Sequence, residues 1–142
     1  MKFRSKKHFT RTAVLFLGIC VGYHLVEARK QAEPAVLPMV ASAVVPLYPP
    51  LARATNIQGV IHVQVSTDGH QVATAHAQED IKPLSVAAEE NSKTWQFSAH
   101  TPVTFTISYH YKLSKQCNPN NPTVILRLPT DVEICQYPFN EY

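Results

Sequence analysis

Seven histidines and two pairs of adjacent acidic residues are the most suggestive side chains of this 142-residue chain for binding a metal ion or transferring protons. The acidic pairs are Glu79-Asp80 and Glu89-Glu90. Histidine is the commonest metal ligand and changes its charge near neutral pH, so close histidines would indicate a metal or acid–base site. Whether these residues meet depends on the strands and helices that carry them.

Two of the histidines belong to a predicted β-hairpin. A strand-like run ends at Asp68-Gly69, a pair that favours a tight turn because its positive φ angles match the twist of paired strands. With these two residues as the loop, His62 lies opposite Ala75, and His76 lies opposite Ile61. This register places the two imidazoles on opposite faces of the sheet, where they cannot share a metal ion.

The remaining candidates are better explained as solvated surface groups. His70 lies in the turn, His100 in a loop and His110 on the polar face of a strand. No nucleophile stands beside a base at a motif spacing, and the four glycines form no phosphate-binding loop. The sequence therefore predicts no enzyme activity, no catalytic residue, no metal, no cofactor and no small-molecule substrate.

The N-terminus has the layout of an export signal. Basic residues precede a mostly apolar stretch, residues 13–26. Roughly 14 apolar residues fit a signal peptide better than a membrane span, which needs about 20, but Arg29-Lys30 would be an unusual start for a mature chain. Residues 1–28 are therefore either a cleaved signal peptide or an N-terminal membrane anchor. In both cases residues 31–142 face the periplasmic side of the cell envelope, because the basic residues stay inside.

Export changes how the charge and the cysteines of the chain are interpreted. Five of the thirteen Lys and Arg residues and one of the ten acidic residues lie in residues 1–28, which leaves eight bases and nine acids. This balance excludes a nucleic-acid partner. An oxidising compartment favours a disulfide between Cys117 and Cys135, worth about 3 kcal/mol for a loop of about 18 residues. Two unrelated buried thiols are the alternative.

The exported part divides into three segments. Residues 29–46 are rich in proline and predict an extended linker. Residues 47–113 predict a small domain with a short helix at Pro49-Pro50, the hairpin, a second helix over residues 83–94 and an alternating strand over residues 103–113. Residues 114–142 form an extension with a further strand over residues 123–128 and a shorter one over residues 131–135, which the disulfide would hold near the end of the alternating strand.

The predicted core lies beside the second helix and the alternating strand. Trp95 and Phe97 follow the helix, and Phe105 and Ile107 are on the apolar side of the strand. Aromatic residues at a helix end beside a sheet are more often buried than binding. We therefore expect these four residues to be structural.

The order of these elements, and the residues at their joints, resemble the C-terminal domain of the TonB energy-transducer family. The resemblance covers roughly residues 46–113 and rests on Tyr48-Pro49, Ala52-Arg53, Gln58-Gly59, Asp68-Gly69, Trp95, Phe97 and the alternating strand. It implies an α+β fold: a small single domain with a three-stranded antiparallel sheet and two helices, to which the extension 114–142 is added.

The resemblance also implies a function. It predicts a non-catalytic envelope protein that binds outer-membrane transporters or related envelope proteins in energy-coupled transmembrane transport, together with an inner-membrane proton-channel complex. An edge strand gives such docking a physical basis, because its unpaired backbone groups can pair with a peptide. Tyr48 and Arg53, where the linker meets the domain, are candidate partner-binding residues, although a packing role fits Tyr48 equally well. The alternative is an envelope assembly module that forms a homodimer or holds a complex through its edge strand.

Overall fold

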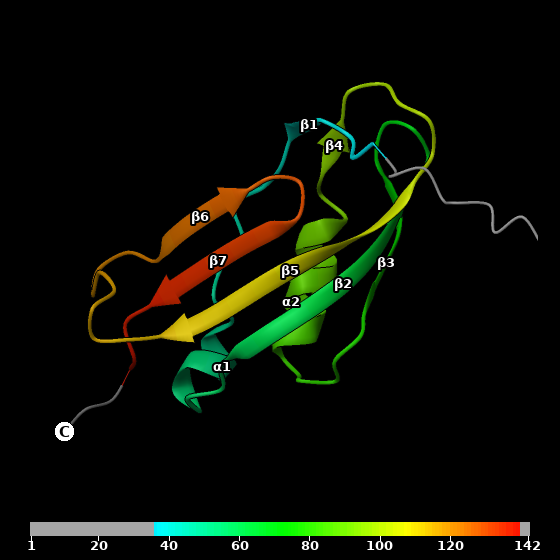
Figure 1. Cartoon of the computed structure of the whole chain (residues 1–142). Coiled ribbons are helices and arrows are strands. Elements are labelled where there is room, and N and C mark those ends of the chain that lie inside the picture. Colours follow the sequence, from blue (N-terminus) through cyan, green and yellow to red (C-terminus); the bar gives the residue numbers. More distant parts are fainter. Residues whose placement is uncertain (1–35, 140–142) are drawn as a thin grey trace, which may run out of the picture. The chain divides into compact units, whose positions relative to one another are not determined.

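The computed structural model describes residues 36–139 (Figure 1). The predicted signal or anchor, residues 1–28, lies outside the described residues, as does the first part of the linker. The elements in chain order are β1 (Val40–Ser42), α1 (Pro50–Ala54), β2 (Gly59–Thr67), β3 (Val72–Ala77), α2 (Leu84–Ser92), β4 (Gln96–Phe97), β5 (Thr104–Leu113), β6 (Thr123–Arg127) and β7 (Asp131–Gln136). None of the helices in residues 36–139 has the length and apolar character needed to cross a membrane.

Five strands form one mixed sheet in the order β3-β2-β5-β7-β6. Neighbouring strands are antiparallel except β5 and β7, which are parallel. The prediction of a three-stranded antiparallel sheet is therefore wrong, because the extension adds β6 and β7 beside β5. The physical reason is that Val132 and Ile134 of β7 are fully buried and continue the apolar face of the sheet beyond β5.

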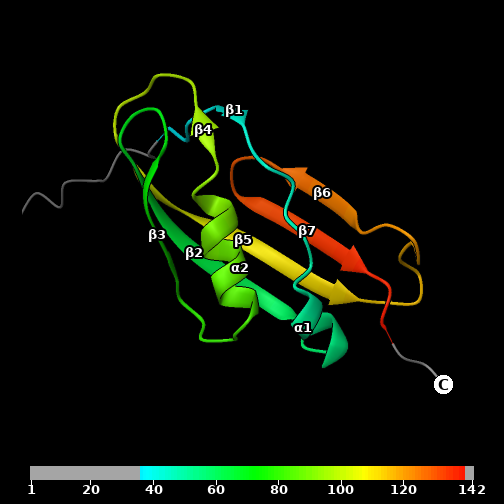
Figure 2. The ribbon, with the colours of Figure 1, turned by 180° about the vertical axis from the view of Figure 1, so that it is seen from behind.

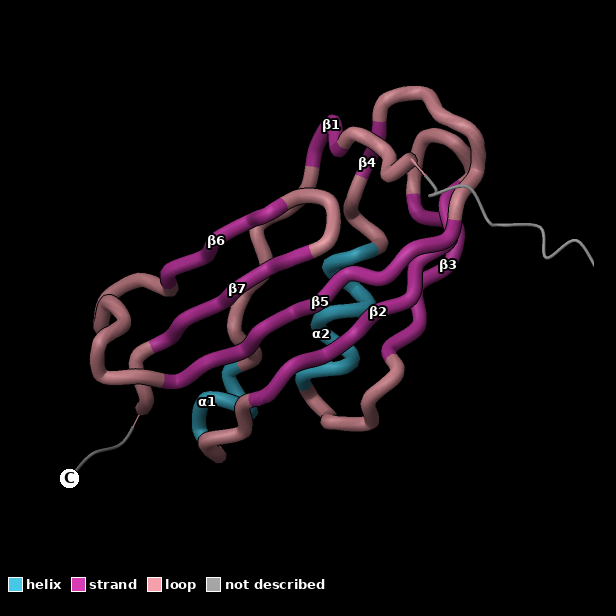
Figure 3. The backbone as a smooth tube through the Cα atoms, viewed as in Figure 1, coloured by secondary structure: helices cyan, strands magenta, loops and turns pink. Residues whose placement is uncertain are grey.

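A separate two-stranded sheet joins β1 to β4, and Figure 3 shows it apart from the five-stranded sheet. The second part of the predicted linker thus belongs to the folded domain. Val40 and Ala43 pack against the core. The chain between β1 and α1 then runs beside α2 over one face of the five-stranded sheet (Figure 2), where the Asn91 side-chain amide donates a hydrogen bond to the Val44 carbonyl (2.8 Å).

The core lies between the sheet and this covering layer of α2 and residues 43–49. All four predicted core residues are buried: Trp95, Phe97, Phe105 and Ile107. Phe97 packs edge-on against Phe105 with ring centroids 6.0 Å apart. Aromatic pairs prefer this arrangement because the positive ring edge meets the negative ring face.

The β2–β3 hairpin has a different register from the predicted one. Gln64 lies opposite His76, and the Gln78 N–H donates to the His62 carbonyl (2.8 Å). Residues 62 and 64 lie on the same face of β2. Residues directly opposite each other on neighbouring strands also lie on one face of the sheet. His62 and His76 are therefore on the same face of the sheet, and the prediction that they face opposite ways is wrong.

The turn explains this shift. The Asp68 carboxylate accepts hydrogen bonds from the N–H groups of His70 and Gln71, each at 2.9 Å. Asp68 therefore flanks the loop, and Gly69, with φ +107°, and His70 form its centre. A bulge between Ser66 and Thr67 shifts the pairing by one further residue. Because the total shift is odd, the returning strand presents its other set of side chains to the core.

Cys117 and Cys135 are paired in the structure, with Cα atoms 5.7 Å apart. This confirms the predicted pairing. The separation lies within the range of about 4.4–6.8 Å found for disulfides. The bond connects the loop that follows β5 to β7, beside the junction of β5 and β7.

A buried hydrogen-bond network joins α2 to β5. The Asn91 side-chain oxygen accepts from the Tyr109 hydroxyl (3.0 Å) and from the Trp95 indole N–H (3.2 Å). Tyr109 also contacts the Ser92 hydroxyl (3.0 Å). The neighbouring Tyr111 hydroxyl is buried and has no hydrogen-bond partner among the described residues. Burial raises the pKa of both tyrosines, so both hydroxyls stay protonated at neutral pH.

The two tyrosines should respond differently to loss of the hydroxyl. We expect Tyr109→Phe to lower the free energy of unfolding by about 1–2 kcal/mol, because it removes buried hydrogen bonds and leaves Asn91 with one donor fewer. Tyr111→Phe should be neutral or stabilise the fold by up to about 1 kcal/mol, because an unpaired buried hydroxyl is costly. Urea unfolding of both variants measures the difference. A larger loss for Tyr111→Phe than for Tyr109→Phe would contradict the assigned network.

Candidate functional site

Tyr48, the first predicted partner-binding residue, lies in the core with only 6% of its surface exposed. Its hydroxyl donates to the Ile57 carbonyl (2.7 Å), and its ring packs edge-on against Tyr111 with centroids 5.5 Å apart. Burial raises the pKa of Tyr48 to about 12. The structure therefore gives Tyr48 a packing role in holding the chain that precedes α1 against β5.

Arg53, the second predicted partner-binding residue, is attached to the C-terminal segment. Its Nε–H donates to the Tyr137 carbonyl (2.8 Å), and its guanidinium lies 4.0 Å from the centre of the Phe139 ring. Stacking of a guanidinium on an aromatic ring is an attractive contact. Tyr48 and Arg53 thus each join different parts of the domain to one another.

The edge of β5 is occupied. In the predicted three-stranded sheet, β5 would be an edge strand available for docking. In the structure β7 pairs with it from Ser108↔Asp131 to Leu113↔Gln136. This pairing moves the edge of the sheet away from β5 and leaves β3 and β6 as the outermost strands.

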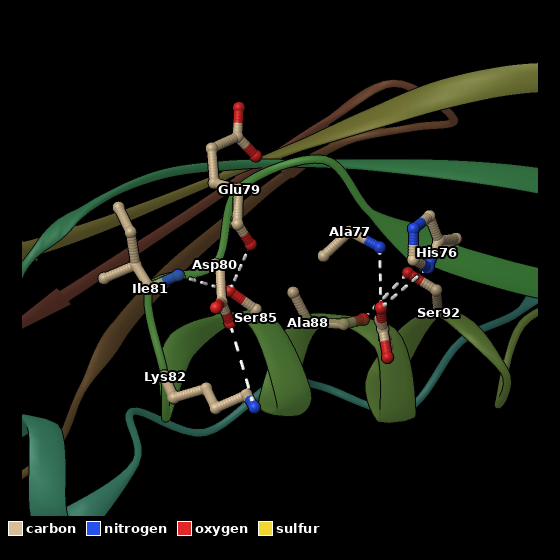
Figure 4. Close-up of polar contacts among 10 residues, drawn as sticks. His76, Ala77, Glu79, Asp80, Ile81, Lys82, Ser85, Ala88 and Ser92 are labelled. Atoms are coloured by element: carbon tan, nitrogen blue, oxygen red, sulfur yellow. Dashed lines mark hydrogen bonds and ion pairs between the residues drawn. The ribbon is translucent and has the colours of Figure 1, made fainter.

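The edge at β3 is partly closed by α2. The Ala77 N–H donates to a carboxylate oxygen of Glu89 (2.7 Å), and His76 Nδ1 lies 3.7 Å from the same oxygen. Figure 4 shows Ala77 and His76 directed at the helix. An acidic side chain that occupies an outward N–H prevents a further strand from pairing there, and charged groups commonly protect edge strands in this way.

The connection from β3 to α2 is also held by acidic and hydroxyl groups. Glu79 accepts the His62 backbone N–H (2.6 Å) and contacts the His62 ring. Burial would raise the pKa of Glu79, but these hydrogen bonds outweigh burial and keep its pKa below the usual value. Ser85 bridges the Glu79 carbonyl (2.6 Å) and the Ile81 N–H (2.9 Å), as Figure 4 shows. These polar residues therefore position the backbone.

No metal centre emerges from this arrangement. His62 and His76 share a face but contact different carboxylates, those of Glu79 and Glu89. Among residues 36–139 there is no group of three or more His, Cys, Asp or Glu side chains placed to hold a metal ion.

The edge at β6 is open. In residues 36–139 no strand pairs with its outer side, and Figure 3 shows it as the outermost strand. Val124 and Leu126 pack against the core, whereas Ile125, on the opposite face, is 41% exposed. Alternate residues of an edge strand direct their backbone N–H and C=O groups outward, so β6 offers unpaired groups to another chain.

β6 has only part of the usual protection of an edge strand, because Pro122 and Pro129 lie outside it. It contains no proline and no lysine, and its register with β7 is regular from Thr123↔Cys135 to Arg127↔Asp131. Its one charged residue, Arg127, is 3.5 Å from Glu133 of β7. Among the described residues, β6 is therefore the edge strand with the fewest obstacles to further pairing. Sequence patterns predicted a strand here but carried no signal for its place at the edge, which depends on the non-local pairing of β5 with β7.

No protein-family model matches this chain, and no curated protein matches its sequence. The fold and the site define, in structural terms, a small α+β domain with one sheet edge partly closed by α2 and one open.

Proposed function

We propose that this chain is a non-catalytic protein of the cell envelope that binds an extended segment of a partner protein by strand addition at β6. One observation carries the proposal: among residues 36–139 the outer side of β6 is unpaired, whereas β5 is paired with β7 and, at the β3 edge, Glu89 occupies the Ala77 N–H. Backbone hydrogen bonds would supply affinity, and side chains on the two faces would supply selectivity.

The place and partner of this binding are part of the proposal. The export-type N-terminus and the paired cysteines support a location on the periplasmic side of the envelope. The resemblance of residues 46–113 to the TonB C-terminal domain supports an outer-membrane transporter, or a related envelope protein, as the partner. Binding at β6, which belongs to the extension, would then be a route of docking specific to chains that carry this extension.

The partner segment should have a definite pattern. A strand added at β6 would place side chains alternately beside Ile125 on the open face and beside Val124 and Leu126 on the covered face. Apolar residues suit both places, since they would bury the exposed part of Ile125 and the exposed parts of Val124 and Leu126. An acidic residue of the partner near Arg127 would pair with the Arg127 guanidinium, as Glu133 does.

Capture of envelope proteins tests this function. The full-length chain, tagged and expressed in cells, is recovered from mildly solubilised envelopes, and co-purifying proteins are identified by mass spectrometry. We expect outer-membrane transporters or related envelope proteins in the eluate. Their recovery should fall about tenfold with Ile125→Lys, because lysine on an edge strand opposes pairing with another strand. A tenfold loss corresponds to about 1.4 kcal/mol of binding free energy.

Thr74→Lys is the matched control. Thr74 is an exposed residue of the other edge strand, on the same face of the sheet as Ile125. Recovery with Thr74→Lys should equal that of the unsubstituted chain. Equal losses in both variants, or no loss with Ile125→Lys, would exclude β6 as the binding edge.

A further inference from the structure

We propose that β6 pairs with β6 of a second copy of this chain when no partner segment is bound. The pairing rests on the proposed function in that both use strand addition at the same edge. It identifies a resting occupant for β6, which a partner strand would displace.

The sequence of β6 is complementary to itself in the antiparallel direction. With Ile125 opposite Ile125 of the second copy, Val124 lies opposite Leu126, and Thr123 opposite Arg127. The isoleucines meet on the open face, where Ile125 is 41% exposed. The Val–Leu pairs meet on the covered face, where Val124 and Leu126 already border the core. Apolar side chains therefore face apolar side chains on both faces.

The charges also permit this pairing. In the antiparallel arrangement the two Arg127 residues lie at opposite ends of the five-residue ladder, about 13 Å apart along the strands at about 3.3 Å per residue. Each remains beside Glu133 of its own copy, 3.5 Å away. Like charges therefore do not meet across the pair.

The pairing is limited in length and in number of copies. Pro122 and Pro129 flank β6, and proline cannot donate to a β-ladder, so the ladder ends near these residues. A two-fold arrangement uses the same edge in both copies. The outer strands of the resulting ten-stranded sheet would be the two β3 strands, where Glu89 occupies the Ala77 N–H. A two-fold pairing through β6 uses the β6 edge of both copies, so this contact by itself joins only two copies.

The interface is small, which suits a resting state. Pairing of five residues from each strand buries much less surface than the roughly 1,200–2,000 Å² of total buried area typical of stable complexes. Pairing of this size should be reversible and dependent on concentration, so that a longer or better matched partner strand can replace it.

Cysteine cross-linking in cells tests the pairing and its register. Directly opposite Cα atoms of antiparallel strands are about 4.5–5.5 Å apart, within disulfide range. The full-length chain carrying Ile125→Cys, with Cys20→Ala to remove the third native cysteine, should give a reducible dimer on mild oxidation. Thr74→Cys in the same background should remain monomeric. Val124→Cys and Leu126→Cys should cross-link strongly only when the two variants are expressed together.

The outcomes separate this pairing from the proposed function. A reducible dimer with no other envelope protein linked would support the pairing and oppose partner binding. Links only to other envelope proteins would overturn the pairing and support the proposed function, and no links of either kind would overturn both. Sedimentation of the unsubstituted chain in mild detergent gives an independent measure, because we expect a concentration-dependent dimer whose dissociation constant rises about tenfold or more with Ile125→Lys. A monomer at every concentration would overturn the pairing.

Discussion

Replacement of Trp95 by alanine is expected to lower the free energy of unfolding by about 3–5 kcal/mol. The side chain is completely buried, its ring lies 6.5 Å from that of Phe97, and its N–H binds Asn91. The change would therefore leave a large cavity and remove a buried hydrogen bond. Small domains are stable by only about 5–15 kcal/mol, so the loss is a large share of the total.

Circular dichroism during urea unfolding measures this effect without relying on tryptophan fluorescence. Val86→Ala is the matched control, because Val86 lies on α2 but is 43% exposed. The control should lose less than about 1 kcal/mol. A comparable loss in the two variants would show that the core does not centre on Trp95.

Removal of the disulfide should have the second largest effect. The double variant Cys117→Ser with Cys135→Ser is expected to lose about 3 kcal/mol, the value of the chain-entropy model for a loop of this length. The cysteines are 18 residues apart in the sequence. In the unfolded chain their bond would restrict the segment that carries β6.

Urea unfolding with and without reductant checks this prediction. Reductant should destabilise the natural chain and leave the double variant unchanged, which makes the variant its own control. Alkylation of Cys117 and Cys135 in the native protein without reductant would contradict the pairing.

Local patterns predicted the elements better than their pairing. Alternation of apolar residues located β2 and β5, and the core residues that it selected, Phe105 and Ile107, are buried. The hairpin register was wrong because Asp-Gly was placed at the centre of the turn. The Asp68 carboxylate instead binds the N–H groups of the next residues, and no periodicity in the strands reveals such a local contact.

The sheet was predicted incompletely for a different reason. The strands over residues 123–127 and 131–136 were expected, but their position depends on the parallel pairing of Ser108 with Asp131. Such a contact joins residues far apart in the sequence and leaves no local signal. The burial of Val132 and Ile134 is the physical cause of this pairing. It can be recognised only when the edge of β5 is known to be available to another strand.

The candidate site was the least predictable part. Arg53 was expected to bind a partner because it lies at a junction, but Tyr137 and Phe139 come from the far end of the chain. Glu89 looked like a solvated residue on a helix, because nothing in its neighbourhood indicates that it would cap the Ala77 N–H. The open edge at β6 follows instead from the pairing of β5 with β7, which no single motif reveals.

The parallel pairing of β5 with β7 also has a consequence for the order of folding. The hairpins β2–β3 and β6–β7 join residues close in the chain, so each can form early. The contact between β5 and β7 instead requires closure of a loop, whose entropy is lost before the contact stabilises anything. The Cys117–Cys135 bond lies beside this contact. The bond therefore shortens the loop that the β5–β7 pairing must close, whereas the β2–β5 pairing, from Gly59↔Tyr111 to Ser66↔Thr104, spans a longer stretch of sequence without such a link among the described residues.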